Sequence, residues 1–438
     1  MSSGLQIAIA FGSVAVLLGL MAVVKRLAAA RDFSPEVQRK LVHIGTGLYA
    51  LTLPWLFTDD WPVYMLIGLT LIVMAVLRTP ALAKGGIGET LHGVERQSYG
   101  DLLLALAVGT VFLLADGRAI LYILPIATLT LADAAAALTG SRYGSKFFTV
   151  EDGRKSLEGS TAFFTITLVI SMVCLLLLSD VPRPNVVLLS VMVAAFGTLV
   201  EADSWRGFDN FFLPAGLMVF LESHMNSPWQ ELVVLLFLFL LAIVIFLRIA
   251  PRFGITKHAA RVYVISTFLL ISVTALQNTV LPLLVFVTHA FARRANPCRA
   301  AWPELDIVAA LALASFAWLA SEMIIPFNAL MFYGLMSVGL SVGLIAVAFG
   351  PREIWVRLGA AGLVGVGLFT LYAALMRYNA PHVLWPGDMR LLGVLTILLV
   401  VGIAGLRPAM FETHRAAKLT LLALVVPVIG YSAKVITA

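Results

Sequence analysis

The stretch LPIATLTLADAAAALTGSRYG, residues 124–144, decides the fold. It starts as an apolar run typical of a membrane-spanning helix, and it ends in a short polar segment that begins at Gly140. Asp133 lies inside the apolar run, about two helical turns before Gly140. A carboxylate within a span is costly and usually has a function. The stretch therefore predicts a membrane helix that carries a functional acid near one membrane face.

The composition of the whole chain agrees with a membrane protein. Of the 438 residues, 61% are apolar and 12% are charged, whereas soluble domains average about 45–50% apolar and about 25% charged residues. The mean hydropathy is +0.98. These values exclude a cytosolic enzyme, a disordered protein and a fibrous protein, and two cysteines are too few for a disulfide scaffold. The remaining fold class is all-α, a polytopic helical membrane protein.

Apolar segments separated by Pro, Gly, Asp or Arg predict about 16 transmembrane helices. We expect them near 4–24, 41–58, 61–77, 99–115, 119–140, 159–179, 186–202, 210–223, 229–247, 262–277, 279–292, 305–322, 325–349, 354–376, 389–406 and 416–434. No signal peptide is evident, because the basic residues follow the first segment instead of preceding it. We therefore expect the first segment to be a span.

The basic residues predict the orientation of these helices. With the N-terminus outside, all but five of the 30 Lys and Arg residues fall on the inner side. We therefore expect an integral, multi-pass membrane protein with both chain ends outside and its active site on the cytoplasmic face. The net charge of +6 follows from this bias and does not indicate a nucleic acid as partner.

Several polar groups fall at the same inner face as Asp133 in this arrangement. They are Arg39, Lys40 and His43 at the start of the second span, Gly140, Arg142 and Gly144 after Asp133, Lys155, Ser156, Glu158, Gly159 and Ser160 at the start of the sixth, and Glu201, Asp203, Asp209 and Asn210 after the seventh. The polar stretch 78–98 is expected there too.

These residue types suit phosphoryl transfer when they are combined. Closely spaced glycines let a backbone approach phosphate, a helix start binds anions, and clustered carboxylates can hold Mg²⁺. Each group alone also has a plainer interpretation: a basic flank, a solvated acidic loop, a packed histidine, or an acid that is buried for packing. Together they can cradle phosphates, hold Mg²⁺ and exclude water, and the apolar surroundings imply a lipid-soluble acceptor.

Four motifs resemble the polyprenol kinase family, which includes phytol kinase, dolichol kinase and the CTP-dependent diacylglycerol kinase. They are RKLVHIGTG (39–47), LADAAAALTGSRYG (131–144), KSLEGSTA (155–162) and FDNFFLP (208–214). The stretch ERQSYGDLLLALAVG (95–109) is a looser match. The set is more specific than any one motif. The resemblance implies transfer of the terminal phosphate of CTP, or of another nucleoside triphosphate, to a lipid alcohol such as phytol, geranylgeraniol or dolichol, with Mg²⁺.

The resemblance, together with the carboxylates clustered at 201–209, implies roles for individual residues. Those expected to be catalytic are Asp133, Lys155, Glu158 and Asp209, and those expected to hold the metal are Asp133, Glu201 and Asp209. Those expected to bind the nucleotide are Arg39, Lys40, His43, Gly140, Arg142, Gly144, Ser156, Gly159, Ser160 and Asn210. We expect Mg²⁺, or Lys155 together with Arg142, to compensate the charge of Asp133.

The resemblance covers about half of the chain. It predicts a lipid-kinase-like domain at 1–225 and an additional transmembrane region of unknown role at 226–438. Polar residues in the later spans are expected to cap or pack helices: Gln277, Asn278, His289, Glu322 and Asn328. The later region could widen a lipid groove, mediate association, or be a transporter-like module.

Other functions remain open at this point. A CTP-dependent diacylglycerol kinase or an enzyme similar to phosphatidate cytidylyltransferase would use the same motifs. A transporter is disfavoured, because the second half of the sequence has no clear counterpart to Asp133. The sequence identifies neither the alcohol nor the oligomeric state, and only the resemblance favours CTP over ATP. Membrane lipids, a nucleotide and a lipid alcohol are the expected partners.

Overall fold

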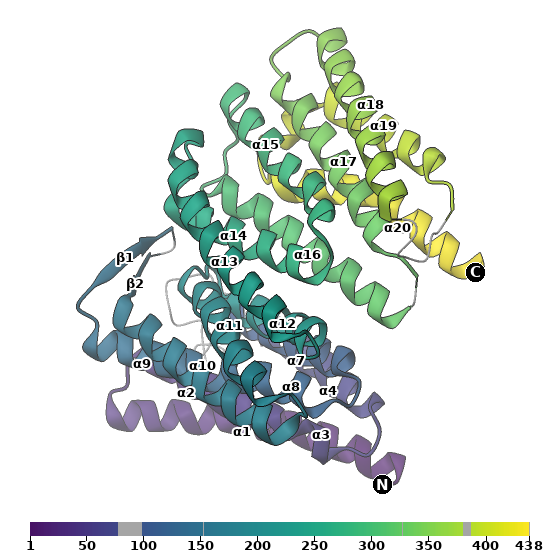
Figure 1. Ribbon diagram of the computed structural model, residues 1–438. Helices are drawn as coiled ribbons and strands as arrows, with labels where there is room; N and C mark the ends of the chain where they lie inside the picture. Colours follow the sequence, from purple (N-terminus) through teal and green to yellow (C-terminus); the bar gives the residue numbers. More distant parts are fainter. Residues whose placement is uncertain (78–98, 152, 326, 380–386, 438) are drawn as a thin grey trace. The chain divides into compact units, whose positions relative to one another are not determined.

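The computed structural model describes residues 1–77, 99–151, 153–325, 327–379 and 387–437, so the polar stretch 78–98 lies outside the described residues. The chain forms two compact units, Met1–Leu240 and Leu241–Ala438. It passes from one to the other within helix α13, Trp229–Ile249 (Figure 1). The boundary expected near residue 225 precedes this helix, and the division of function between the units stays a prediction.

In its described residues, the first unit consists of helices and one small hairpin. Its helices are α1 (Ser3–Arg31), α2 (Pro35–Leu51), α3 (Leu53–Leu56), α4 (Trp61–Leu77), α7 (Gly100–Ala115), α8 (Ala119–Ala127), the π-helix η1 (Thr128–Ala132), α9 (Asp133–Tyr143), α10 (Leu157–Leu178), α11 (Arg183–Ala202), α12 (Asp209–His224) and the first part of α13. The hairpin pairs β1 (Phe147–Val150) with β2 (Gly153–Ser156) in antiparallel register, with Phe147 opposite Ser156.

The second unit is helical throughout the residues described. Its helices are the rest of α13, η2 (Ala250–Phe253), α14 (Lys257–Val273), η3 (Leu276–Thr279), α15 (Val280–Ala295), α16 (Pro303–Ile324), α17 (Leu330–Ala348), α18 (Ile354–Asn379), α19 (Arg390–Leu406), η5 (Pro408–Phe411) and α20 (Arg415–Thr437). Helix α17 is buried along its whole length, and helices α15, α16, α18, α19 and α20 all contact it.

The helices agree with an all-α membrane protein. Each segment expected to span the membrane overlaps one or more helices. Residues 41–58 contain most of α2 and the short helix α3, and residues 119–140 contain α8, η1 and most of α9. Among the described residues, 9 helices are long and apolar enough to cross a membrane, and three shorter apolar helices accompany them: Trp61–Leu77, Gly100–Ala115 and Arg390–Leu406. The expected total of 16 spans is therefore not confirmed.

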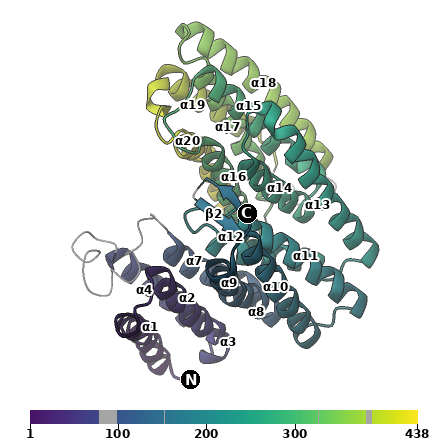
Figure 2. The ribbon, with the colours of Figure 1, turned by 90° about the vertical axis from the view of Figure 1, so that its left-hand side faces the viewer.

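Helices α1, α2 and α4 meet around a small apolar core in the first unit. Met21 and Val24 from α1, Val42 from α2 and Met74 from α4 form a buried cluster. Figure 2 shows α1 beside α2 and α4 at the margin of this unit. Between helices in a bilayer, close van der Waals packing of such side chains stabilises the contact. This cluster fixes α2, which carries the first sequence motif.

Polar residues expected to cap or pack helices in the second unit do so, with one exception. Gln277 Nε2 donates to Asn379 Oδ1 (2.8 Å), and Asn379 Nδ2 donates to Asn278 Oδ1 (2.6 Å). Asn328 Oδ1 accepts a hydrogen bond from the Met331 amide, and Glu322 accepts one from the Ala329 amide. The exception is the buried ring of His289, whose two nitrogens have no hydrogen-bond partner among the described residues.

The predicted orientation can be tested at the two ends of α10. This helix has 22 residues, which corresponds to about 33 Å and therefore to the hydrocarbon core of a bilayer. Thr149 lies before its first residue and Asp180 after its last, and both are exposed. In a chain with Cys174 and Cys298 replaced by Ser, we expect Thr149→Cys to react with an impermeant maleimide only after the cells are permeabilised. Asp180→Cys should react in intact cells. The opposite pattern would reverse the orientation.

Candidate active site

Asp133 lies where one long helix changes its winding. Helices α8 and α9 are joined by the π-helical segment Thr128–Ala132, and Asp133 follows it directly. Pro125, inside α8, lacks an N–H group and so interrupts the regular hydrogen-bond ladder just before this segment. Single π-helical turns occur often at functional sites. The side chain of Asp133 is buried here, as the sequence predicted for an acid within a span.

Lys40 on α2 forms a buried ion pair with Asp133. The distance from Lys40 Nζ to Asp133 Oδ2 is 2.6 Å, and the two side chains are 9% and 5% exposed. His43, one turn further along α2, brings Nε2 to 3.5 Å from the same oxygen and to 3.3 Å from the Leu129 carbonyl oxygen. A buried charge must be paired to be tolerated. Lys40 supplies that pairing, which the sequence analysis had assigned to Mg²⁺ or to Lys155 with Arg142.

Glycine at position 47 allows α2 to lie this close to Asp133. A Cβ atom at Gly47 would lie 2.2 Å from Thr130 Oγ1 in the π-helical segment. Close approach through glycine is typical of helix contacts in membranes. Gly45 has the same function toward α1, because a Cβ there would lie 2.5 Å from a methyl group of Leu20. The GTG sequence at 45–47 is thus explained by packing.

A second ion pair joins the hairpin to α11. Lys155 Nζ lies 2.6 Å from Glu201 Oε1, and it also donates to the Glu201 carbonyl oxygen (3.0 Å) and to Ser204 Oγ (3.4 Å). Burial disfavours the charged form of this lysine. The carboxylates of Glu201 and Asp209 outweigh that effect, so the pKa of Lys155 lies above its ordinary value. Lys155 therefore stays positively charged at neutral pH. The carboxylate of Asp133 is a third negative charge that raises the pKa of Lys155.

The segment between α11 and α12 brings Asp209 and Asn210 to the same region. Arg206 (φ 53°) and Gly207 (φ 81°) adopt the left-handed conformation and turn the chain sharply into α12. Asn210 Nδ2 then donates to the Gly100 carbonyl oxygen at 2.8 Å, which holds α12 against the start of α7. Asp209 precedes it as the first residue of α12. Asp209 and Asn210, two residues of the expected site, thus lie where α12 contacts the start of α7.

Three glycines near the hairpin have a packing role in the structure. A Cβ at Gly159 would lie 2.9 Å from the Ala136 carbonyl oxygen, and one at Gly140 would lie 2.8 Å from Ser156 Oγ. A Cβ at Gly144 would lie 2.4 Å from the Gly140 carbonyl oxygen. Gly140 and Gly159 thus let α9 and α10 approach closely, and Gly144 allows the tight turn at the end of α9. Binding of phosphate by Gly140, Gly144 and Gly159 stays a prediction.

Other residues expected to face the nucleotide have structural partners. Ser156 Oγ accepts a hydrogen bond from the Gly159 amide (3.1 Å) and so caps α10. Glu158 accepts hydrogen bonds from Ser145 Oγ and from the Lys146 amide, at the base of the hairpin. Arg142 is exposed, and its guanidinium lies 5.5 Å from the centre of the Tyr143 ring. Ser160 Oγ is enclosed and finds no hydrogen-bond partner among the described residues.

The structure therefore collects part of the predicted set into one cluster. Hereafter, the charged cluster means Lys40, His43, Asp133, Lys155, Glu201 and Asp209. Arg39 and Asn210 line a groove beside it, whereas Glu158 and Arg142 have their contacts at the hairpin and at the end of α9. The sequence analysis missed Ser204, which contacts Lys155, and Asp101, which lines the groove. An acid in the first turn of an apolar helix was the signal for Asp101.

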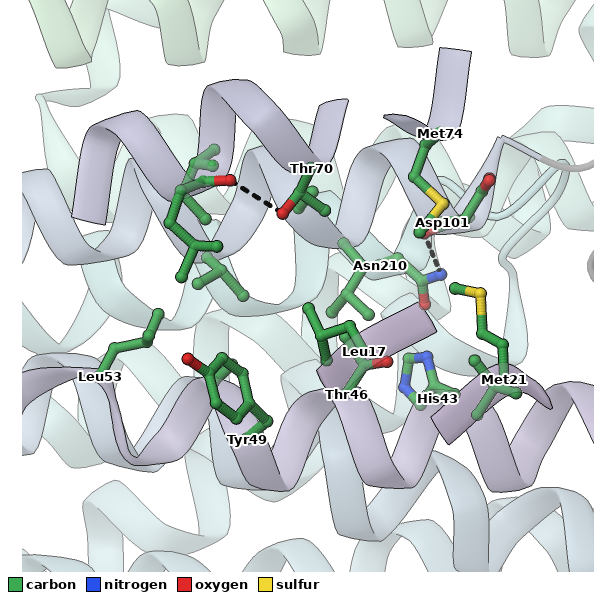
Figure 3. A pocket seen from close by; sticks show the side chains of 18 of the residues that line it. Leu17, Met21, His43, Thr46, Tyr49, Leu53, Thr70, Met74, Asp101 and Asn210 are labelled. Atoms are coloured by element: carbon green, nitrogen blue, oxygen red, sulfur yellow. Dashed lines mark hydrogen bonds between the residues drawn. The ribbon is translucent and has the colours of Figure 1, made fainter. Parts of the chain in front are cut away.

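A groove with a cavity volume of about 100 Å³ lies between helices α1, α2, α4 and α7. Arg39 and His43 on α2, Asp101 on α7 and Asn210 on α12 contribute ionisable and amide groups to its lining, and Thr46, Tyr49 and Thr70 add hydroxyl groups. Figure 3 shows Leu53 and Tyr49 at one end of the groove, and His43, Asp101 and Met74 toward the other. His43 and Asp101 thus lie toward the same end of a groove that is otherwise lined mostly by apolar side chains. His43 belongs to both the groove and the charged cluster.

The charged cluster has the donors that Mg²⁺ prefers. Magnesium is usually held by one or two carboxylates together with substrate phosphates. Asp209 and Asp133 supply hard oxygen ligands, and Lys40 and Lys155 supply positive charge beside them. In the described ranges, no group of three or more His, Cys, Asp or Glu side chains is arranged as a ready-made metal site. A magnesium site completed by a nucleotide fits these residues, and it stays a prediction.

Comparison with known proteins gives one informative match. The chain is 34% identical over 215 residues to a curated phytol kinase from Synechocystis sp. (strain ATCC 27184 / PCC 6803 / Kazusa). The match covers 48% of this chain and 88% of that relative. No family model matches the chain, and no solved structure matches it.

The buried pair between Lys40 and Asp133 predicts a specific pattern of stability. We expect Asp133→Asn to lower the free energy of unfolding by about 3–5 kcal/mol, because it leaves Lys40 buried without a counter-charge. The double variant Lys40→Met with Asp133→Leu should regain most of that loss, because it removes both charges. Denaturant unfolding in detergent measures these changes.

A matched control is the more exposed pair between Arg118 and Glu222 in the same unit. Glu222→Gln should change the unfolding free energy by less than about 1 kcal/mol. An equally small effect of Asp133→Asn would mean that Lys40 and Asp133 are not paired in the folded protein.

Proposed function

The chain belongs to the polyprenol/phytol kinase-like family, and from this premise we propose that it is a membrane lipid kinase that phosphorylates a lipid alcohol. We propose CTP as the phosphate donor and Mg²⁺ as the metal, with the reaction on the cytoplasmic face of the membrane. The observation that carries the proposal is the charged cluster. It joins three carboxylates, two lysines and a histidine within a unit built of apolar helices.

Each part of the cluster has a role in this proposal. Lys155, which stays charged, attracts the phosphates of the nucleotide from the hairpin side. Asp209 and Asp133 hold Mg²⁺, which neutralises charge on the phosphates when it is bound. Lys40 limits the repulsion between these carboxylates and the incoming nucleotide. Catalysis of this kind depends mainly on position and charge and needs few covalent steps.

The acceptor follows from the surroundings of the cluster. The groove beside the cluster is lined mostly by apolar side chains and offers polar groups at one end. A water-soluble acceptor would gain little from such a lining, whereas a lipid alcohol would bury its chain there. Phytol, geranylgeraniol, dolichol and diacylglycerol are therefore the alcohols to compare.

Purified full-length protein should transfer labelled phosphate from CTP to at least one of these alcohols when Mg²⁺ is present. We expect Asp133→Asn and Asp209→Asn each to lower turnover per folded molecule by roughly 10²–10³, the cost of losing one preorganised electrostatic contributor. Glu222→Gln is the control, and its turnover should match that of the unaltered protein. Unchanged turnover in both Asp variants would remove the charged cluster from the reaction.

The first unit alone should carry the activity. Every residue of the charged cluster lies within Met1–Leu240, and α13 ends at Ile249. A fragment of residues 1–249 should therefore bind CTP and retain kinase activity, because it keeps α13 whole. Comparison of its specific activity with that of the full chain tests this division. A folded fragment that does not bind nucleotide would show that the second unit supplies part of the site.

A further inference from the structure

The second unit contains a buried arginine that has an unused hydrogen-bond donor. Arg415, the first residue of α20, is 2% exposed. Its Nε atom donates to the Phe411 carbonyl oxygen (3.1 Å), and its Nη1 atom donates to the Asn296 carbonyl oxygen (2.7 Å). Its Nη2 atom is enclosed and has no acceptor among the described residues. A guanidinium group cannot lose its proton in a protein, so a permanent positive charge lies here in the interior.

The carboxylate whose charge acts on Arg415 does not neutralise it from within the core. This carboxylate belongs to Glu412, whose side chain is 47% exposed and lies 3.6 Å from the Arg299 guanidinium. It is therefore shared with another cation and screened by solvent. In the part of the chain that the structure describes, no ion pair of Arg415 itself is found. The charge of Arg415 is thus held by two carbonyl oxygens alone.

His289 brings a second buried group to the same region. It lies on α15, it is 3% exposed, and both of its ring nitrogens are enclosed without a partner in the described ranges. The charge of Arg415 acts on this ring, and Arg415 contacts the end of α15 through Asn296. Helix α17 packs against both α15 and α20 (Figure 1). A neutral imidazole keeps one N–H group in either tautomer, so His289 always offers a donor.

The charges around His289 leave one positive charge over. Arg293, one turn after His289 on α15, forms an ion pair with the buried Glu304 of α16. This pair is neutral as a whole, so the charge of Arg415 remains even when His289 is neutral. An uncompensated charge in the interior is expensive. A water molecule would accept a hydrogen bond from Nη2, but it would leave the charge in place.

We propose that the second unit binds one small anion of the size of chloride, between Nη2 of Arg415 and a ring N–H group of His289. Such an ion accepts hydrogen bonds from both donors and cancels the remaining charge, whereas a metal cation would be repelled by it. A monatomic ion can be enclosed completely, which suits two residues that are only 2% and 3% exposed. The site lies within Leu241–Ala438 and does not depend on the proposed kinase reaction.

The first experiment measures binding directly. Full-length protein in detergent is dialysed against radioactive chloride at constant ionic strength, with gluconate as the other anion. We expect a single saturable site from which bromide displaces chloride, and we expect sulfate and phosphate not to displace it. Absence of saturable binding would mean that water occupies the site, and it would overturn the proposal. Equal displacement by sulfate or phosphate would overturn the assignment of a monatomic ion.

The second experiment tests His289. An anion that binds only the folded chain raises the Tm as its concentration rises. His289→Phe keeps a ring but removes its N–H donor, so it should weaken chloride binding by about tenfold or more, the cost of one hydrogen bond to a charged group. His289→Gln keeps an N–H donor and should bind chloride more tightly than His289→Phe. If folded His289→Phe binds chloride as tightly as the unaltered protein, His289 is not part of the site.

The third experiment tests the charge of Arg415. Arg415→Met should bind no chloride, and its Tm should not respond when chloride replaces gluconate, whatever its own stability. Arg299→Gln is the matched control, because the Arg299 side chain is 78% exposed, and it should keep the full response. A response of unchanged size in folded Arg415→Met would show that the salt acts elsewhere, and it would overturn the proposal. If Arg415→Met does not fold, the two His289 variants still decide.

Discussion

The buried contact between Lys40 and Asp133 is the interaction on which the first unit depends. Two opposite charges, 9% and 5% exposed, meet at 2.6 Å between apolar helices. Either charge alone would be expensive in this position, so each fixes the place of the other. The contact also holds α2 against the π-helical segment, which brings His43 to the edge of the groove. The part of the proposed site that faces the lipid and the part that faces the nucleotide are therefore held together by this one ion pair.

The positions of the helices along the chain were predictable from the sequence, because they follow from the bilayer as solvent. A chain in a bilayer must satisfy its backbone hydrogen bonds within helices, so apolar runs locate the helices directly. The polar groups at the inner ends of these runs then had to lie near one another. This reasoning placed Asp133, Lys155, Glu201 and Asp209 in one region, and the structure collects them there. The number of spans is harder to predict, because several apolar helices are shorter than a bilayer requires.

The partners within the site could not be predicted in the same way. Which cation meets Asp133 depends on how far α2 is rotated and how closely it approaches, and both depend on the contact of Gly47 with Thr130. A pattern of closely spaced glycines can indicate either a phosphate-binding loop or close packing of helices. Gly140, Gly144 and Gly159 resemble a phosphate-binding pattern, yet each is required by the close packing of α9 and α10 or of the turn between them. The spacing of glycines in the sequence does not distinguish phosphate binding from packing, whereas the contact distances in the structure show the packing.

The π-helical turn before Asp133 has a consequence for how the sequence can change by insertion or deletion. An α-helix rotates each successive residue by about 100°, since it has 3.6 residues per turn. A π-helical turn holds about one residue more than an α-helical turn, so loss of a single residue between Thr128 and Ala132 can be absorbed by a return to regular winding. Asp133 would then keep its direction toward Lys40 instead of rotating by about 100°. The five residues Thr128–Ala132 therefore contain one residue that the helix can lose while the carboxylate keeps its place.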